Sequence, residues 1–354
     1  MSDSYALILA GGRGARFWPR SRRDTPKQCL SVDGGPTLIQ QALSRLEPLV
    51  PVKNILVVTG PDMEASVRAQ LPSLPAENIL IEPQPRNTAP GIGLGAVEVE
   101  RRAGPDAVVA CLPADQIVTE PDALRAALSA AMAAARAEQA IVTLGITPTF
   151  PATGYGYLSL GAQRGTFAGQ AVYQVDAFRE KPDRQTAAAY LAAGGVLWNA
   201  GMFVFRVADM RAAFAAHLPR SSAALDAIAA DPGALRAQWG EMEATSIDYG
   251  IMERSDRVLT VPCDAGWSDV GSWEAAAALM PEEQGHRALA ALLVSVEAAG
   301  CVVYAPEKLV ALLGVEDLVV VDSPDALLVT RRDRAQSVRD IVRILERSGQ
   351  TKYT

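Results

Sequence analysis

The chain opens with an apolar run that ends in a glycine turn. Residues 6–9 have strand character, and Gly11, Gly12 and Gly14 follow directly. Glycine reaches backbone angles that are closed to other residues, so such a turn can point successive N–H groups at one spot and bind an anion. The basic side chains next to the turn are Arg13, Arg16, Arg20, Arg22, Arg23 and Lys27. This stretch indicates a site for polyphosphate.

Two common phosphate loops do not match the turn. A Walker loop needs Gly-Lys before Ser or Thr, and Gly-Lys occurs nowhere in the sequence. A dinucleotide fingerprint needs a third glycine where this chain has Phe17. A glycine turn with solvated arginines remains the structural alternative. The net charge of −7 argues against nucleic-acid binding, which requires a basic face, and instead suits a small phosphorylated substrate.

Strand-like and helix-like segments alternate through the first 150 residues. This alternation predicts a doubly wound α/β sheet, mixed but mostly parallel and Rossmann-like. Ligands of such sheets bind beyond the carboxyl ends of the strands, where we expect 11–16, 82–90 and 113–116. The expected strands are 54–59, 78–81, 107–112, 141–144, 155–160, 171–178 and 201–206, and the expected helices are 38–46, 63–70, 89–102 and 122–138.

The pattern changes near residue 285. Short apolar segments then recur every eight or nine residues, and they are 292–296, 300–304, 309–313, 318–321 and 326–329. Such spacing predicts a small β-rich module that resembles a few coils of a β-helix. We therefore divide the chain into a main domain, 1–284, and a C-terminal module, 285–354. A basic helix, 334–347, ends the module, and we interpret its charge as a solvated face.

The cysteines and histidines limit the chemistry. The four cysteines are Cys29, Cys111, Cys263 and Cys301. Because they lack C-x-x-C spacing and lie in apolar surroundings, we expect reduced core thiols and neither zinc ligands nor disulfides. His217 and His286 lie far from every candidate motif, which disfavours catalysis by histidine. The sequence shows no signal-peptide pattern and no membrane span, so we expect a cytoplasmic location.

Two aspartates lie in settings that suit a divalent cation. Asp115 follows the predicted strand 107–112, and Asp269 lies between Trp267 and Trp273. Mg²⁺ prefers one or two carboxylates together with waters and substrate oxygens. From the residues alone, a helix cap or turn is the alternative for Asp115, and a packed aromatic turn is the alternative for Asp269.

Seven separated motifs resemble, in order, those of the sugar-phosphate nucleotidyltransferases. The first, GGRGARFWPRSRRDTPKQ, has the Trp-Pro-x-Ser-Arg form that is typical of the mannose-1-phosphate guanylyltransferases. Residues 178–182, Phe-Arg-Glu-Lys-Pro, are similar to the F-x-E-K-P box, and 266–273 are similar to the W-x-D-x-G motif. The other matching segments are 82–90, 153–157, 198–201 and 246–253. The resemblance covers nearly the whole chain.

This resemblance implies transfer of GMP from GTP to α-D-mannose 1-phosphate, which gives GDP-mannose and pyrophosphate. Mg²⁺ on Asp115 and Asp269 would assist in-line attack of the sugar phosphate on the α-phosphorus, and no protein nucleophile is needed. Arg16 and Lys27 would bind the leaving phosphates, and Lys181 would bind the attacking phosphate. Together these five form the expected catalytic set.

The resemblance also implies two sets of binding residues. Glu82 is our candidate for the base, because a carboxylate can accept from guanine N1–H and N2–H₂ together. Asn199 can both donate to and accept from a pyranose. The expected nucleotide-binding residues are Leu9, Ala10, Gly11, Gly12, Gly14, Arg16, Lys27, Glu82, Arg86, Asn87, Thr88 and Asp115. The expected sugar-phosphate residues are Gly154, Tyr155, Glu180, Lys181, Asn199, Gly201 and Asp248.

Two other functions stay open. A nucleotidyltransferase for glucose 1-phosphate or a heptose phosphate would keep the phosphate machinery and change the sugar and base contacts. A non-catalytic sugar-nucleotide sensor is disfavoured because both carboxylates and both lysines are present. Longer bacterial relatives carry an isomerase domain with histidine ligands; since no histidine follows His286, we expect no isomerase activity. A homodimer is the candidate assembly, and neither nucleic acid nor membrane is an expected partner.

Overall fold

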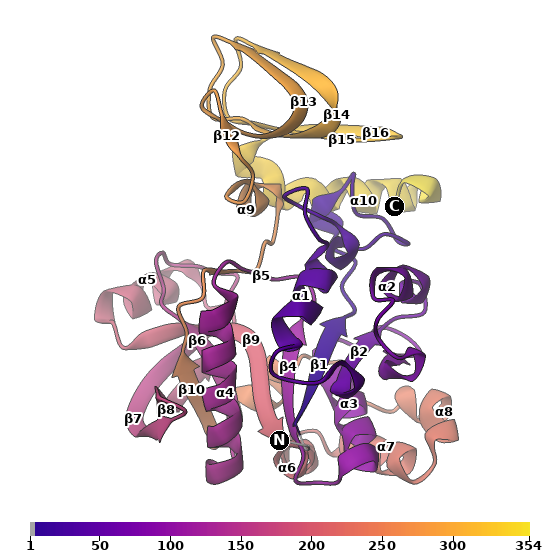
Figure 1. Ribbon diagram of the computed structural model, residues 1–354, viewed down its shortest axis with the longest axis vertical. Coiled ribbons are helices and arrows are strands. Elements are labelled where there is room, and N and C mark those ends of the chain that lie inside the picture. Colours follow the sequence, from indigo (N-terminus) through magenta and orange to yellow (C-terminus); the bar gives the residue numbers. More distant parts are fainter. Residues whose placement is uncertain (1–3) are drawn as a thin grey trace.

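The computed structural model describes residues 4–354, so the first three residues of the predicted main domain lie outside the described part. A large sheet with helices on both faces forms one end of the molecule, and a small β module forms the other (Figure 1). No helix among residues 4–354 is long and apolar enough to cross a membrane. All four cysteines are buried and unpaired, as predicted.

Within residues 4–354, nine strands form the main sheet. Its strands are β1 (Ser4–Ala10), β2 (Ile55–Thr59), β3 (Ile79–Ile81), β4 (Val108–Pro113), β6 (Ile141–Ile146), β7 (Tyr157–Phe167), β8 (Gln170–Arg179), β9 (Val196–Arg206) and β10 (Val258–Pro262). The spatial order is β3-β2-β1-β4-β9-β6-β10-β8-β7. Only β8 and β9 of this sheet run against the common direction. The prediction of a mixed, mostly parallel sheet is confirmed.

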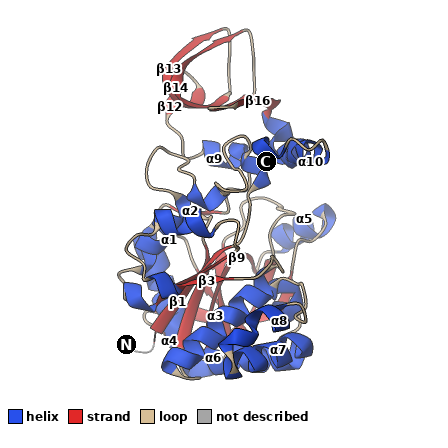
Figure 2. Cartoon of the chain, turned by 90° about the vertical axis from the view of Figure 1, so that its right-hand side faces the viewer, coloured by secondary structure: helices blue, strands red, loops and turns tan. Residues whose placement is uncertain are grey.

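Helices cover both faces of this sheet (Figure 2). One face packs against α1 (Leu38–Leu46), α2 (Glu64–Gln70) and α4 (Pro121–Glu138). The other packs against α3 (Thr88–Ala103), α6 (Val207–His217) and α7 (Pro219–Ala230). Side chains of β1 alternate between the two cores, as a strand buried on both faces requires. The main domain also contains α5 (Arg184–Ala193) and α8 (Leu235–Trp239).

Predicted and observed bounds agree for α1 and differ most at β7 and β9. The strand predicted at 155–160 begins at Tyr157 and continues to Phe167. The strand predicted at 201–206 already begins at Val196, so the motif at 198–201 lies inside β9. There the register with β6 shifts, and Gly201 has a φ of 69°. A glycine at a bulge bends a strand without ending it. In the sequence, Gly201 therefore resembles the start of a strand although it lies inside one.

The C-terminal module is a five-stranded sheet. Its strands are β12 (Glu282–Glu283), β13 (His286–Val296), β14 (Val302–Leu313), β15 (Leu318–Ser323) and β16 (Ala326–Arg331). β13, β14 and β15 pair in parallel, and β16 returns antiparallel to β15. The two segments predicted at 300–304 and 309–313 join into the single strand β14. The long parallel strands β13 and β14 enclose a small core that includes Leu293, Val303 and Leu312, as expected for a β-helix-like coil.

One hydrophobic cluster joins this module to the glycine turn. The helix predicted at 334–347 consists of a 3₁₀ turn, Arg332–Ser337, and α10 (Val338–Arg347). Its basic residues are exposed, as predicted, but its apolar side packs against a shared core. We call this core the junction cluster, and its members include Phe17, Trp18, Val270, Trp273, Tyr304, Val319 and Val338. The ring of Trp273, in α9 (Trp273–Ala277), lies 5.0 Å from Phe17 and 5.2 Å from Tyr304 between centroids.

Candidate active site

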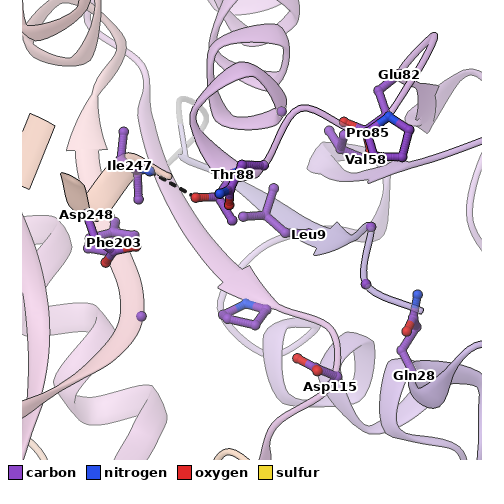
Figure 3. A pocket seen from close by; sticks show the side chains of 16 residues that line it. Leu9, Gln28, Val58, Glu82, Pro85, Thr88, Asp115, Phe203, Ile247 and Asp248 are labelled. Atoms are coloured by element: carbon purple, nitrogen blue, oxygen red, sulfur yellow. Dashed lines mark hydrogen bonds between the residues drawn. The ribbon is translucent and has the colours of Figure 1, made fainter. Parts of the chain in front are cut away.

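A cavity of about 430 Å³ opens beyond the carboxyl ends of β1, β3 and β4. In Figure 3, Glu82 and Asp248 come from opposite sides of this cavity, with Leu9 and Thr88 between them. This is the position at which doubly wound sheets bind ligands. The predicted residues that line it are Leu9, Gly11, Gly12, Glu82, Asn87, Thr88, Asp115, Gly201 and Asp248.

The glycine turn is held closely against Lys27. Gly14 has a φ of 66°, and a Cβ at this position would overlap the Lys27 side chain. The Ser21 hydroxyl donates to the Gly14 carbonyl at 2.8 Å. At the end of β1, the Ala10 carbonyl accepts from Gln28 Nε2 at 2.9 Å and from the Thr59 hydroxyl at 3.0 Å. Only glycine at position 14 allows this approach, so the turn fixes where Lys27 lies.

Lys27 joins the two predicted metal-site aspartates. Its side chain is 6% exposed, and Nζ contacts Asp115 Oδ2 at 3.0 Å. The same ammonium group donates to the backbone carbonyl of Asp269 at 2.8 Å. The carboxylate of Asp269 accepts from the Tyr155 hydroxyl at 2.9 Å. Two loops that are far apart in the sequence therefore meet at the buried ammonium group of Lys27.

A two-stranded sheet brings these loops together. β5 (Ile117–Val118) follows Asp115, and β11 (Trp267–Ser268) precedes Asp269. The two strands pair antiparallel. Gly266 begins this pairing with a φ of 59°, and a Cβ there would overlap the Thr119 hydroxyl. The pairing therefore depends on glycine at this position, and it sets the separation of the two aspartates.

The segment after β3 forms another wall of the cavity. Glu82 is only 5% exposed, and burial raises the pKa of its carboxyl to about 7. Arg86 does not line the cavity; its Nη1 donates to the Met242 carbonyl at 2.8 Å. Asn87 caps α3 by accepting from the Thr88 backbone N–H. The Thr88 hydroxyl accepts from the Ile247 N–H at 2.9 Å (Figure 3), which ties the two walls together.

Most of the predicted sugar-side residues form a polar cluster. Asn199 Nδ2 donates to Asp248 Oδ1 at 3.1 Å, and its Oδ1 accepts from the Thr143 hydroxyl at 2.7 Å. Lys181 Nζ lies 2.7 Å from Glu180 Oε1. Burial and the nearby charge of Glu180 raise the pKa of Asp248 to about 6. Burial lowers the pKa of Lys181, but Glu180 and Asp248 raise it by more.

Some predicted residues lie outside the lining. Arg16 Nε is buried without a hydrogen-bond partner among residues 4–354. A Cβ placed at Gly154 would have no atom of residues 4–354 within 4 Å. Tyr155 points to Asp269 and away from the Asn199 cluster. Ala10 and Gly14 shape the turn without lining the cavity.

Both parts of the chain match models of known protein families. A family model described as Nucleotidyl transferase matches residues 5–284. The chain belongs to this family. A second model, described as MannoseP isomerase/GMP-like beta-helix domain, matches residues 292–345 of this nucleotidyl transferase. The predicted family and the β-helix-like character of the module are confirmed.

Similar proteins extend over nearly the whole chain. Mannose-1-phosphate guanylyltransferase from Escherichia coli is 38% identical over 98% of this chain and 75% of its own length. Xanthan biosynthesis protein XanB from Xanthomonas campestris pv. campestris (strain B100) is 36% identical over 100% of this chain and 76% of its own length. A crystal structure described as mannose-1-phosphate geranyltransferase from Thermus thermophilus is 37% identical, with a TM-score of 0.86 over 97% of this chain and 99% of that chain.

Nucleotidyl transferases act on a nucleoside triphosphate and a sugar 1-phosphate, and they generally use a divalent metal ion. Among residues 4–354 there is no group of three or more His, Cys, Asp and Glu side chains that could hold a metal. Asp115 and Asp269 nevertheless fit a Mg²⁺ site, because this ion is commonly bound by one or two carboxylates plus substrate phosphates. Their all-oxygen donors are the type that Mg²⁺ prefers.

Several residues of this nucleotidyl transferase that line the cavity were not predicted. They are Gln28, Val58, Pro85, Gly91, Pro113, Phe203 and Ile247. Gln28 is 1% exposed and holds the end of β1. Its position directly after Lys27 is the only signal in the sequence, and its burial, which requires a fixed partner, is seen only in the structure. The apolar lining residues resemble ordinary core residues in the sequence.

Proposed function

We propose that this nucleotidyl transferase transfers GMP from GTP to α-D-mannose 1-phosphate and releases pyrophosphate. The observation that carries the proposal is the meeting of Asp115 and Asp269 at the Lys27 ammonium group, beside the glycine turn. Lys27 contacts the carboxylate of Asp115 and the backbone carbonyl of Asp269, so the two loops that carry these aspartates lie side by side where we propose that the triphosphate binds. The similarity to proteins named mannose-1-phosphate guanylyltransferase supports the choice of base and sugar.

On the nucleotide side, separate groups would bind the base and the phosphates. The ionised Glu82 carboxylate would accept from guanine N1–H and N2–H₂. The open face of the glycine turn would donate backbone N–H groups to phosphate oxygens. Arg16 would pair with a leaving phosphate, which would also satisfy its buried, unpartnered Nε. Lys27 would contact the leaving phosphates from the other side of the turn.

On the sugar side, Lys181 would hold the attacking phosphate. Glu180, Asn199 and Asp248 present both donors and acceptors to sugar hydroxyls. An oxygen of the sugar phosphate would form the new bond to the α-phosphorus while the bond from that phosphorus to the pyrophosphate oxygen breaks. These side chains would align the two substrates and neutralise charge, which is the main requirement for phosphoryl-type transfer. Mg²⁺ bound through Asp115 and Asp269 would add charge neutralisation at the phosphate oxygens.

The test is pyrophosphate release from a grid of substrates. GTP, ATP, CTP and UTP would each be combined with mannose, glucose and heptose 1-phosphates, and the sugar nucleotide would be identified by mass spectrometry. We expect the pair GTP and mannose 1-phosphate to give the highest kcat/KM. Faster turnover of another pair would reassign the substrate. Tight binding of a sugar nucleotide without turnover of any pair would establish a sensor.

The binding of GTP is expected to depend on pH through Glu82. Because burial raises its pKa to about 7, the carboxyl is largely protonated at pH 6 and cannot accept from both guanine donors. We therefore expect the Kd for GTP to fall by up to about tenfold between pH 6 and pH 8 and to level off above that. Calorimetric titration over pH 5.5–8.5 measures this dependence. Glu82→Gln should bind GTP weakly at every pH, and an unchanged pH profile in this variant would refute the role.

We also propose that two copies associate through the outer face of the module. On β13 and β14 the outward residues are aliphatic, namely Leu292, Val294, Val296, Leu309 and Leu313. Leu292 pairs with Leu309, and Val296 pairs with Leu313, so they form one patch. Monomers rarely expose such patches, and a patch without charged members can pack against its own copy.

Light scattering after size-exclusion chromatography measures this assembly. We expect the mass of two chains for the wild type and of one chain for Leu313→Glu, because Leu313 is 70% exposed and a charge in the contact would stay unpaired. Ile344→Glu is the matched control, since Ile344 is 63% exposed on α10 and outside the patch. A wild type of single-chain mass would contradict the dimer.

The division into a main domain, 1–284, and a C-terminal module, 285–354, is likewise part of the proposal. The separate sheets of the two parts support a division near this point, although β12 (Glu282–Glu283) of the module's sheet lies just before the proposed boundary. We also propose a cytoplasmic location. The four unpaired thiols support it, because free cysteines are typical of a reducing compartment.

A further inference from the structure

Tyr155 contacts the predicted metal ligand rather than the sugar cluster. It lies between β6 and β7, two residues before β7 begins. Its hydroxyl donates to Asp269 Oδ1 at 2.9 Å. A hydrogen bond from a neutral donor to a carboxylate is among the stronger ones in proteins. The contact therefore gives the Asp269 side chain a preferred orientation.

Aromatic neighbours fix the direction of this hydroxyl. The Tyr155 ring meets Trp198 at 5.1 Å, Trp267 at 5.3 Å and Phe150 at 6.4 Å between centroids, edge to face in each case. Such pairs prefer this geometry and resist rotation of the ring. Because a tyrosine has only two side-chain torsions, holding the ring also holds the oxygen. The hydroxyl is thus set in place before any ligand binds.

Lys27 and Tyr155 hold Asp269 from two sides. Lys27 fixes its backbone carbonyl at 2.8 Å, and Tyr155 fixes its carboxylate. A tyrosine hydroxyl carries a proton at physiological pH, so it can donate to this carboxylate. Without this donor, the half-buried carboxylate would be free to rotate about its own side-chain bonds.

We propose that Tyr155 is a positioning residue that orients the Asp269 carboxylate toward the divalent cation. The inference rests on the proposed function, because it assumes that Asp269 binds the cation. Groups that hydrogen-bond to metal ligands typically contribute 10–100-fold to metal affinity or activity.

The decisive variant is Tyr155→Phe, which keeps the aromatic packing and removes only the hydroxyl. Tyr157→Phe is the matched control. Tyr157 is a buried tyrosine two positions on, and its hydroxyl donates to the Ala152 carbonyl at 3.0 Å. Loss of that hydrogen bond should lower the free energy of unfolding without changing the contacts of Asp269. Both proteins would first be compared by thermal unfolding to establish that they are folded.

Two measurements test the role. Mn²⁺ binding in the presence of GTP, followed by electron paramagnetic resonance, should weaken roughly 10–100-fold in Tyr155→Phe and stay unchanged in Tyr157→Phe. In turnover assays, the Mg²⁺ concentration for half-maximal rate should rise in Tyr155→Phe while the KM for the sugar phosphate stays near that of the wild type. The same Mn²⁺ affinity in both variants would overturn the proposal.

A rise only in the KM for the sugar phosphate would overturn it too, because Tyr155 would then contact the sugar. Failure of the proposed function has a separate signature. In that case the wild type itself would form no GDP-mannose and would bind no Mn²⁺ with GTP. If the wild type forms product and Tyr155→Phe matches it in every measurement, only the positioning role is wrong.

Discussion

Asp269→Asn is expected to lower kcat roughly a thousandfold while the protein stays folded. A cation on the reacting phosphates contributes several kcal/mol to the transition state, and each 1.4 kcal/mol is about tenfold in rate. Asparagine has the same shape, and its amide oxygen can still accept from Tyr155. The backbone carbonyl that binds Lys27 is also unchanged. Steady-state kinetics across a series of Mg²⁺ concentrations measures the effect.

Asp264→Asn is the control for this prediction. Asp264 lies five positions earlier and is exposed. Its substitution removes the same charge from the same loop. We expect its kinetics to match those of the wild type. Recovery of wild-type turnover by Asp269→Asn at saturating Mg²⁺ would reject the assignment of Asp269 as a metal ligand. A loss of equal size in Asp264→Asn would show an effect of overall charge.

Replacing Lys27 should produce the second large effect. Lys27→Met removes the group that would bind the leaving phosphates and that joins Asp115 to the Asp269 loop. We expect kcat/KM to fall by roughly 10³-fold, the scale on which a positioned cation acts in phosphoryl transfer. The free energy of unfolding should also fall, by on the order of 1–3 kcal/mol, because the Asp269 carbonyl loses its partner.

Lys308→Met is the comparison for Lys27→Met. Lys308 pairs with Asp322 at 2.8 Å, but its side chain is 61% exposed, so the pair should contribute under about 1 kcal/mol. Urea unfolding of both variants separates the effect on stability from the effect on rate. A kcat/KM near that of the wild type in a folded Lys27→Met variant would show that the buried ammonium group has only a structural role.

The sequence predicted those features that depend on local pattern. Continuous apolar runs gave the buried strands, and the bounds of α1 were correct because Thr37 begins the helix and its apolar positions keep one period. The glycine turn also follows from local pattern, and the phosphate site that it indicated stays a prediction. These signals come from neighbouring residues, so a single sequence contains them.

Features that depend on pairing between distant segments could not be predicted. β5 and β11 have two residues each and pair across about 150 positions, and such short strands have no periodicity of their own. Tyr155 matched a sugar-binding motif, yet only the three-dimensional packing of its ring shows that it faces Asp269. The junction cluster was missed for the same reason, since α10 resembled a solvated helix by composition.

The junction cluster couples the segment after the glycine turn to the C-terminal module, because both contribute side chains to one core. Phe17 and Trp18 stand only a few positions from the glycine turn, and they share their packing with Trp273, Tyr304 and Val338. Trp273 also donates to the Trp18 carbonyl at 3.1 Å. A chimera that borrows its coil from a relative would therefore have to borrow the aromatic residues of the loop as well.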